Sequence, residues 1–197
     1  MESIGHLING EWQAGTNEGE RSQAVYNPST GEESKQVPLA SKATVEEAIS
    51  AAQAAFPAWR DTPPIKRARI MARFLTLLNK NQSEIVELIG QEHGKISHDA
   101  AGELTRGIEN VEYATYVPEL LKGEHSKDVA SNIDSWSEFH PLGVVAGITP
   151  FNFPAMVPLW MYPMAIACGN TFILKPSNLT FIIGRIMMNR PYRKKCR

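Results

Sequence analysis

Two polar residues, Asn152 and Lys175, stand where apolar runs end, and both residue types can bind a reacting carbonyl group or a nucleotide. Asn152 belongs to residues 149–154, directly after the apolar run 142–148. Ligands of an open parallel sheet bind beyond the carboxyl ends of its strands, so an amide N–H there can donate to an oxyanion that develops on a carbonyl substrate. The same side chain can instead cap the following helix. The residues by themselves leave both interpretations open.

Lys175 ends the second apolar run, residues 171–175. A lysine in this position can bind a ribose hydroxyl or a phosphate of a nucleotide that lies across the strand ends. It can equally be a strand terminus that reaches water. The spacing does not decide between these two interpretations.

The elements that must position these residues form a β-α-β unit. Residues 142–148 and 171–175 are typical of fully buried parallel strands, and residues 154–167 are long enough for the connecting helix. The 34 residues between His140 and Lys175 carry no charge. A membrane-spanning segment is also uncharged, and this stretch is long enough to be one. Five prolines interrupt this stretch, which argues against a single spanning helix and favours buried β-α-β structure.

The chain before residue 140 is expected to form hairpins and then helices. Asn9-Gly10 and residues 27–32 are turn signals between short apolar pieces. Thr44 and Glu47 form a capping-box pattern at the start of a first helix that ends near Pro57. Further helices are expected over residues 64–78, 83–93 and 99–121, followed by a loop at 123–127 and a half-exposed strand at 133–139.

The charge is distributed unevenly along the chain. The net charge of −1 argues against a nucleic-acid binder, but residues 178–197 hold six basic residues and no acidic one. Cys168 and Cys196 cannot form a disulfide framework, and no cysteine or histidine spacing indicates a metal site. No secretory signal is visible at the start, so a cytoplasmic location, or the mitochondrial matrix in a eukaryote, is expected.

Several segments resemble the NAD-dependent aldehyde dehydrogenases, and specifically their methylmalonate-semialdehyde dehydrogenase branch. The family pattern is seen in GVVAGITPFNFP (143–154), ACGNT (167–171) and LKPS (174–177). The branch is indicated by AMVPLWM (155–161) and PMAI (163–166). Earlier pieces agree: INGEW (8–12), YNP (26–28), EHGK (92–95) and GEL (102–104).

The resemblance implies an α/β chain with an incomplete aldehyde-dehydrogenase fold. Hairpins and helices would precede the first β-α-β unit of a Rossmann-like NAD-binding sheet. Residues 1–177 would be the amino-terminal part of such an enzyme, and residues 178–197 a divergent basic tail. Asn178 stands where the family has a glutamate. The resemblance ends at this position, and no acidic residue follows it. A frameshift, an alternative exon or a different gene-model end explains both changes more simply than a basic targeting or nucleic-acid-binding tail.

The resemblance also implies roles for five residues. Asn152 matches the asparagine that stabilises the oxyanion. Thr149 and Phe151 match positions whose backbone lies against the nicotinamide half of NAD, and Lys175 matches the lysine that binds the adenosine ribose. Arg106 matches an arginine that serves the substrate carboxylate; the alternative for Arg106 is a solvated helix face.

The chemistry of this branch needs a cysteine thiolate that attacks the aldehyde, NAD that takes the hydride, and coenzyme A that cleaves the thioester. The resemblance puts that cysteine beyond residue 197 and denies the role to Cys168 and Cys196, so the chain alone is expected to be inactive. Expected partners are a small semialdehyde and further subunits of a homo-oligomer, without metal, nucleic acid or membrane. Two alternatives remain: a hydrolytic branch of the family, and a non-catalytic fragment that associates with full-length subunits.

Overall fold

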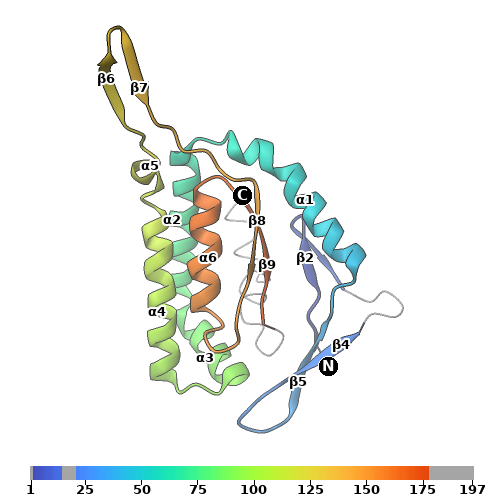
Figure 1. Cartoon of the computed structure of the whole chain (residues 1–197). Coiled ribbons are helices and arrows are strands. Elements are labelled where there is room, and N and C mark those ends of the chain that lie inside the picture. Colours follow the sequence, from blue (N-terminus) through green and yellow to red (C-terminus); the bar gives the residue numbers. More distant parts are fainter. Residues whose placement is uncertain (1, 15–20, 178–197) are drawn as a thin grey trace.

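A two-stranded parallel sheet with helices on both faces organises the computed structural model, which describes residues 2–14 and 21–177 (Figure 1). Strands β8 (Val144–Ile148) and β9 (Thr171–Lys175) pair in register, with Val144 opposite Thr171 and Ile148 opposite Lys175. Helix α6 (Met156–Ala167) connects them, and α1 (Lys42–Arg60) also packs against both strands. The predicted β-α-β unit is therefore confirmed.

The prediction that both strands are fully buried is wrong. Ile148 is 76% exposed, and most of β9 is only half-buried. Among the described residues β8 has β9 as its only neighbour in the sheet, so its other edge is unpaired there. Gly147 shows how closely the covered face packs, because a Cβ there would lie 2.7 Å from Cζ of Phe172.

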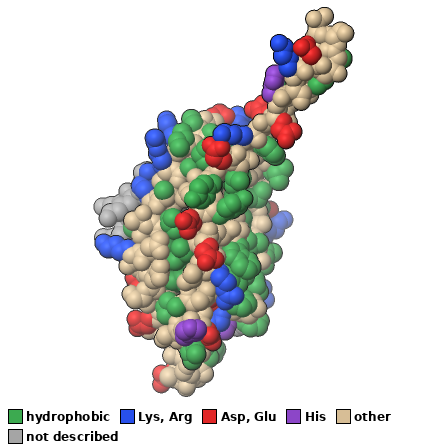
Figure 2. Space-filling model, turned by 90° about the vertical axis from the view of Figure 1, so that its left-hand side faces the viewer, with side chains coloured by type: hydrophobic (Ala, Val, Ile, Leu, Met, Phe, Trp, Pro, Cys, Tyr) green, Lys and Arg blue, Asp and Glu red, His purple; other side chains and the backbone are tan. Residues whose placement is uncertain are grey.

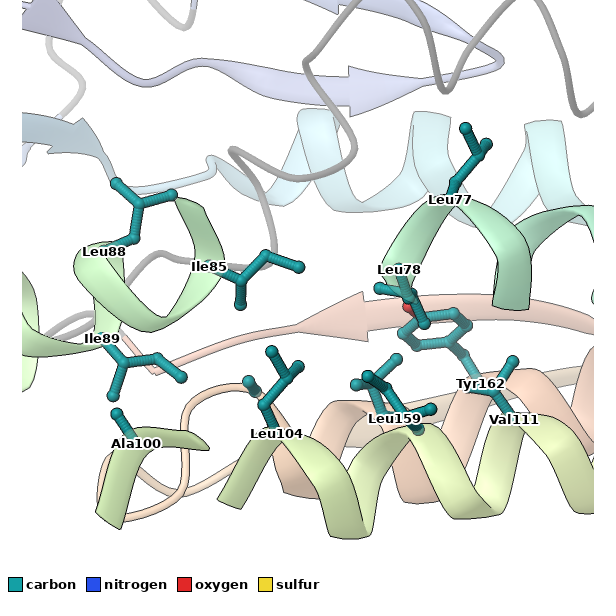
Figure 3. Close-up of a cluster of buried hydrophobic side chains, with 12 residues drawn as sticks. Leu77, Leu78, Ile85, Leu88, Ile89, Ala100, Leu104, Val111, Leu159 and Tyr162 are labelled. Atoms are coloured by element: carbon teal, nitrogen blue, oxygen red, sulfur yellow. The ribbon is translucent and has the colours of Figure 1, made fainter. Parts of the chain in front are cut away.

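The helices form a layer that holds α6 against the sheet. Helix α4 (Ser97–Ala114) packs along α6, while α2 (Pro64–Lys80) and α3 (Gln82–His93) pack against α4. Their shared core contains fully buried apolar side chains from four helices, including Leu78, Ile89, Val111 and Leu159 (Figure 3). Burying one such side chain contributes roughly 1.5–3 kcal/mol, so this core fixes α4 relative to α6.

Both predicted amino-terminal hairpins are present. Strands β2 (His6–Ile8) and β3 (Glu11–Gln13) are joined by Asn9 and Gly10, whose φ angles of 50° and 74° are those that the tight turn requires. Strands β4 (Ser22–Tyr26) and β5 (Glu33–Pro38) form the second pair. The short strand β1 (Glu2–Ser3) adds to β5 in parallel.

A third hairpin, β6 (His125–Ala130) with β7 (Ile133–Trp136), extends away from the body of the molecule (Figures 1 and 2). The strand expected at 133–139 is present over its first four residues, but it is fully exposed and not half-exposed as expected. The loop expected at 123–127 is wrong because β6 begins at His125. Every residue of both strands is exposed. An isolated two-stranded hairpin is only marginally stable in water, and contact with another protein surface would stabilise it.

Several helix boundaries differ from the predictions. Helix α1 begins at Lys42, and its cap is Ser41, whose Oγ accepts a hydrogen bond from the Thr44 backbone N–H at 3.2 Å. It also continues through Pro57 to Arg60. The expected helix over 99–121 is instead α4 and a separate short helix, α5 (Val117–Leu120). In the part of the chain that the structure describes, no helix combines the length and apolarity needed to cross a membrane.

Candidate active site

Thr149 and Lys175 meet at the carboxyl edge of the parallel sheet. The Thr149 backbone N–H donates to the Lys175 carbonyl at 3.2 Å, which continues the pairing of β8 and β9 by one residue. Thr149 is buried, whereas the Lys175 side chain is exposed beyond the strand end. Phe151, two residues further along, is 54% exposed. The edge thus exposes the Lys175 ammonium and the Phe151 side chain to solvent.

Asn152 does not cap helix α6. The cap position is Ala155, and no side chain of the preceding turn bonds the first amides of the helix. Asn152 is exposed, and its side-chain amide makes no hydrogen bond with any other residue that the structure describes. The capping interpretation is therefore wrong, and the Asn152 amide is available to a ligand.

Helix α6 receives its amino-terminal cap from a different helix. The Glu103 side chain projects from α4 and is completely buried. Its Oε1 accepts hydrogen bonds from the backbone amides of Ala155 at 2.8 Å and Met156 at 3.1 Å. A carboxylate is favourable at this end of a helix because it satisfies free N–H groups and meets the positive end of the helix dipole.

Lys95 joins Glu103 to the turn that carries Asn152. Its Nζ donates to Glu103 Oε2 at 2.5 Å and to the Asn152 backbone carbonyl at 2.8 Å. The same ammonium lies 4.1 Å from the centre of the Phe153 ring, within the range of a cation–π contact. The side chain of Lys95 is 15% exposed, so water competes little for these contacts.

Sequence reasoning assigned no role to Lys95 or Glu103, although a signal was present. Glu103 stands beside Leu104 and three residues after Ala100, on the apolar stripe that faces the core. A charged residue on such a stripe needs a buried partner, and that requirement alone marks Glu103 as unusual.

Arg106 lies on the exposed side of α4, close to the same turn. Its Nε donates to the Gly102 carbonyl at 3.2 Å, and its guanidinium carbon lies 6.0 Å from the Phe153 ring centre. Its own carbonyl accepts a hydrogen bond from Trp160 Nε1 at 3.2 Å. The structure therefore brings Arg106 next to the residue that follows Asn152, and its binding role stays a prediction.

Cys168 lies at the opposite end of α6 from Asn152. Twelve helical residues separate the two ends, a length of about 18 Å. The Cys168 thiol is half-buried, 3.8 Å from Sδ of Met164, and burial raises its pKa despite the nearby Arg67 guanidinium. A protonated thiol in this position is a poor nucleophile. Cys196, Asn178 and the rest of the predicted tail at 178–197 lie outside the described residues.

Comparison with known proteins agrees with the family pattern. The profile of the aldehyde dehydrogenase family matches residues 12–190, so the match runs beyond Ser177, and the predicted boundary there stays a prediction. The malonate-semialdehyde dehydrogenase of Pseudomonas aeruginosa is 65% identical over 177 residues, which are 90% of this chain and 35% of that enzyme.

Solved structures give the same picture. The methylmalonate-semialdehyde dehydrogenase of Oceanimonas doudoroffii is 64% identical with a TM-score of 0.87, and the match covers 94% of this chain and 38% of that one. A methylmalonate-semialdehyde dehydrogenase homologue of Sinorhizobium meliloti, solved as a complex with NAD, is 46% identical with a TM-score of 0.87, covering 91% of this chain and 36% of that one. The chain thus spans little more than a third of the length of these relatives.

Proposed function

Because this chain belongs to the aldehyde dehydrogenase family, we propose that it supplies the oxyanion-binding and part of the NAD-binding site of a CoA-acylating methylmalonate- or malonate-semialdehyde dehydrogenase. The observation that carries the proposal is the exposed Asn152 amide, held on a fixed turn beyond the end of β8. The names of the relatives support the semialdehyde as substrate.

Asn152 would stabilise the charge that develops on the aldehyde oxygen. Its Nδ2 carries two N–H donors and has no competing partner among the described residues. The backbone beside it is fixed by Lys95 at 2.8 Å, so the donor needs little reorganisation when the oxyanion forms. One such donor typically lowers a barrier by about 3 kcal/mol.

The residues at the sheet edge fit a dinucleotide. When bound, NAD would accept the hydride that leaves the carbon of the aldehyde group. The Lys175 ammonium is exposed at the end of β9, where it can bond the hydroxyls of the adenosine ribose. The backbone of Thr149 and Phe151 would line the nicotinamide half, as the resemblance implies. The NAD complex of the Sinorhizobium relative supports NAD as the dinucleotide.

Arg106 would bind the free carboxylate of the semialdehyde. Its guanidinium is exposed and makes only one hydrogen bond, to Gly102, among those of the described residues, so donors remain for a carboxylate. Coenzyme A would then be the second substrate that cleaves the acyl intermediate, which rests on the resemblance to this branch of the family.

We infer that residues 1–197 alone do not oxidise aldehydes. The described cysteine, Cys168, has a raised pKa and lies at the wrong end of α6, and Cys196 matches no motif of the family. The purified chain, mixed with NAD, coenzyme A and malonate semialdehyde, should form no more NADH than a heat-treated sample. Turnover above that control would contradict the inference.

A hybrid enzyme tests the proposed function itself. Residues 1–177 of this chain would replace the matching part of the 65% identical Pseudomonas enzyme, which supplies the remainder. The hybrid should form NADH and an acyl-CoA product from malonate semialdehyde, and should prefer it to propanal, which lacks the carboxylate. Arg106→Gln should remove that preference without abolishing propanal turnover. A folded hybrid without turnover would contradict the proposal, and a free acid as the sole product in the presence of coenzyme A would favour the hydrolytic alternative.

The hairpin β6–β7 favours a second candidate function, association with other subunits. It projects from the body and exposes Val129, Ile133 and Trp136 by 55%, 54% and 71%. Exposed apolar side chains on an isolated hairpin indicate a protein–protein contact. Co-purification of residues 1–197 with the intact Pseudomonas enzyme should be lost when Trp136 and Ile133 are both replaced by serine; equal recovery would argue against this contact.

A further inference from the structure

We propose that Lys95 and Glu103 are positioning residues for Asn152, and that their ion pair fixes the turn from which the Asn152 amide reaches the substrate. The proposal deepens the oxyanion-binding role given above and rests on it. Neither residue needs to touch the substrate. Among the described residues, their side-chain hydrogen bonds are with the backbone of the turn at 152–156 and with each other.

The ion pair holds this turn at both ends. At its start, Lys95 Nζ donates to the carbonyl of Asn152 at 2.8 Å. At its end, Glu103 Oε1 accepts from the amides of Ala155 and Met156 at 2.8 and 3.1 Å. The direct bond between Lys95 and Glu103 links the two attachments. Three backbone groups of this short segment are thus hydrogen-bonded to one ion pair.

The pair is itself fixed by the core. Glu103 is 0% exposed, and its neighbours Ala100 and Leu104 on α4 are 0% and 1% exposed. The attachment of the turn to Glu103 is therefore buried and fixed by helix packing. Because Asn152 itself makes no side-chain bond to another described residue, its direction depends on the backbone that Lys95 holds.

The alternative is that this pair only stabilises the fold, as buried ion pairs in other positions do. A second buried pair in the same chain offers a matched control. Lys35 Nζ lies 2.6 Å from Glu92 Oε1, with side chains 8% and 2% exposed, and it joins β5 to α3. Replacing either lysine removes the ammonium from a buried carboxylate. Among the hydrogen bonds of the described residues, those of the Lys95–Glu103 pair reach the turn, whereas Lys35 bonds Glu92.

The first readout is spectroscopic and uses residues 1–197. In labelled protein, Lys95→Met should shift the ¹³C resonance of the Asn152 carbonyl, and Glu103→Gln should shift the Ala155 and Met156 amide protons and speed their hydrogen exchange by at least about tenfold. Lys35→Met should lower the melting temperature while leaving these resonances in place. Unchanged turn resonances in Lys95→Met and Glu103→Gln would overturn the proposal.

The second readout is turnover in the hybrid enzyme, which does not depend on the stability of residues 1–197 alone. Lys95→Met should lower kcat by about 100-fold, the cost of a misplaced catalytic group, with little change in KM for NAD. Lys95→Arg, which keeps a charged donor, should recover kcat to within about tenfold, and Lys35→Met should leave kcat unchanged. If Lys95→Met and Lys35→Met lower the melting temperature alike and neither changes kcat, the positioning role is wrong. If the unmodified hybrid is inactive, the proposed function fails, while the turn resonances still decide the positioning role.

Discussion

Replacing Gly107 with alanine tests the close packing of α4 against α6, and Gly102→Ala on the same helix is its matched control. A Cβ on Gly107 would lie 2.7 Å from Cδ1 of Leu159, 3.1 Å from its Cβ and 3.3 Å from Cα of Met156. A Cβ on Gly102 would meet nothing within 4 Å. The two substitutions therefore differ in contact with α6 and not in helix or residue type.

The expected magnitudes follow from two opposing effects. Both variants gain about 1 kcal/mol, because alanine is a better helix former than glycine. Gly107→Ala also incurs an overpacking cost of about 1–3 kcal/mol, because the new Cβ crowds the completely buried Leu159 side chain and the Met156 backbone. Gly102→Ala should thus melt higher than the unmodified chain, and Gly107→Ala should melt about 2–12 °C below Gly102→Ala.

Calorimetric melting of both variants of residues 1–197 measures this difference directly. Because Met156 begins α6 immediately after the turn at 152–156, the Gly107→Ala variant should also shift the amide resonances of Ala155 and Met156. Equal melting temperatures for the two variants would refute the close approach of the helices, and with it the way in which α4 positions the turn.

Three further predictions concern buried titratable groups. Burial raises the pKa of Cys168, so its reaction with a disulfide reagent at pH 8 should be slow in the folded chain and fast in urea; equal rates would contradict the burial. Burial, and then the Lys95 ammonium, lower the pKa of His93, so the folded state binds this proton less tightly than the unfolded chain. The free energy of unfolding should therefore be highest above about pH 6.5 and decrease as the pH falls below that value. In urea titrations of His93→Gln, the free energy of unfolding should decrease less over the same pH range. Arg67 donates to the Ala167 carbonyl at 2.7 Å, so Arg67→Met should lower the free energy of unfolding by at least about 2 kcal/mol, measured by urea titration, and no loss would contradict a structural role.

The β-α-β unit could be predicted because local signals agreed with the tertiary structure. Two apolar runs, a helix-length connection and the Asn9-Gly10 turn are each determined within a few residues of sequence. Helix ends were less predictable. Thr44 has the right type for a cap, but the cap is Ser41, three residues earlier, and Pro57 is accommodated within α1 where a proline more often marks an end.

The sequence predicted the candidate site residues near the strand ends but missed the buried ion pair that holds the turn. Asn152 and Lys175 were found because polar residues at strand ends have a known chemical use. Whether Asn152 caps α6 could not be decided from the sequence, since the actual cap, Glu103, is 49 residues or more away from that turn in the chain and reaches it only through the packing of α4 on α6. Strand β6 was missed for a different reason. Its residues are all exposed and show no alternation of apolar and polar side chains.

The most direct test of the central claim is the turnover of the Asn152→Ala variant of the hybrid enzyme. Since the Asn152 amide makes no hydrogen bond within the described residues, the variant should melt at the same temperature as the unmodified hybrid. Its kcat with malonate semialdehyde should nevertheless be about 10²–10³-fold lower, the effect of removing one oxyanion donor. A kcat within about threefold of the unmodified hybrid would show that Asn152 does not stabilise the oxyanion.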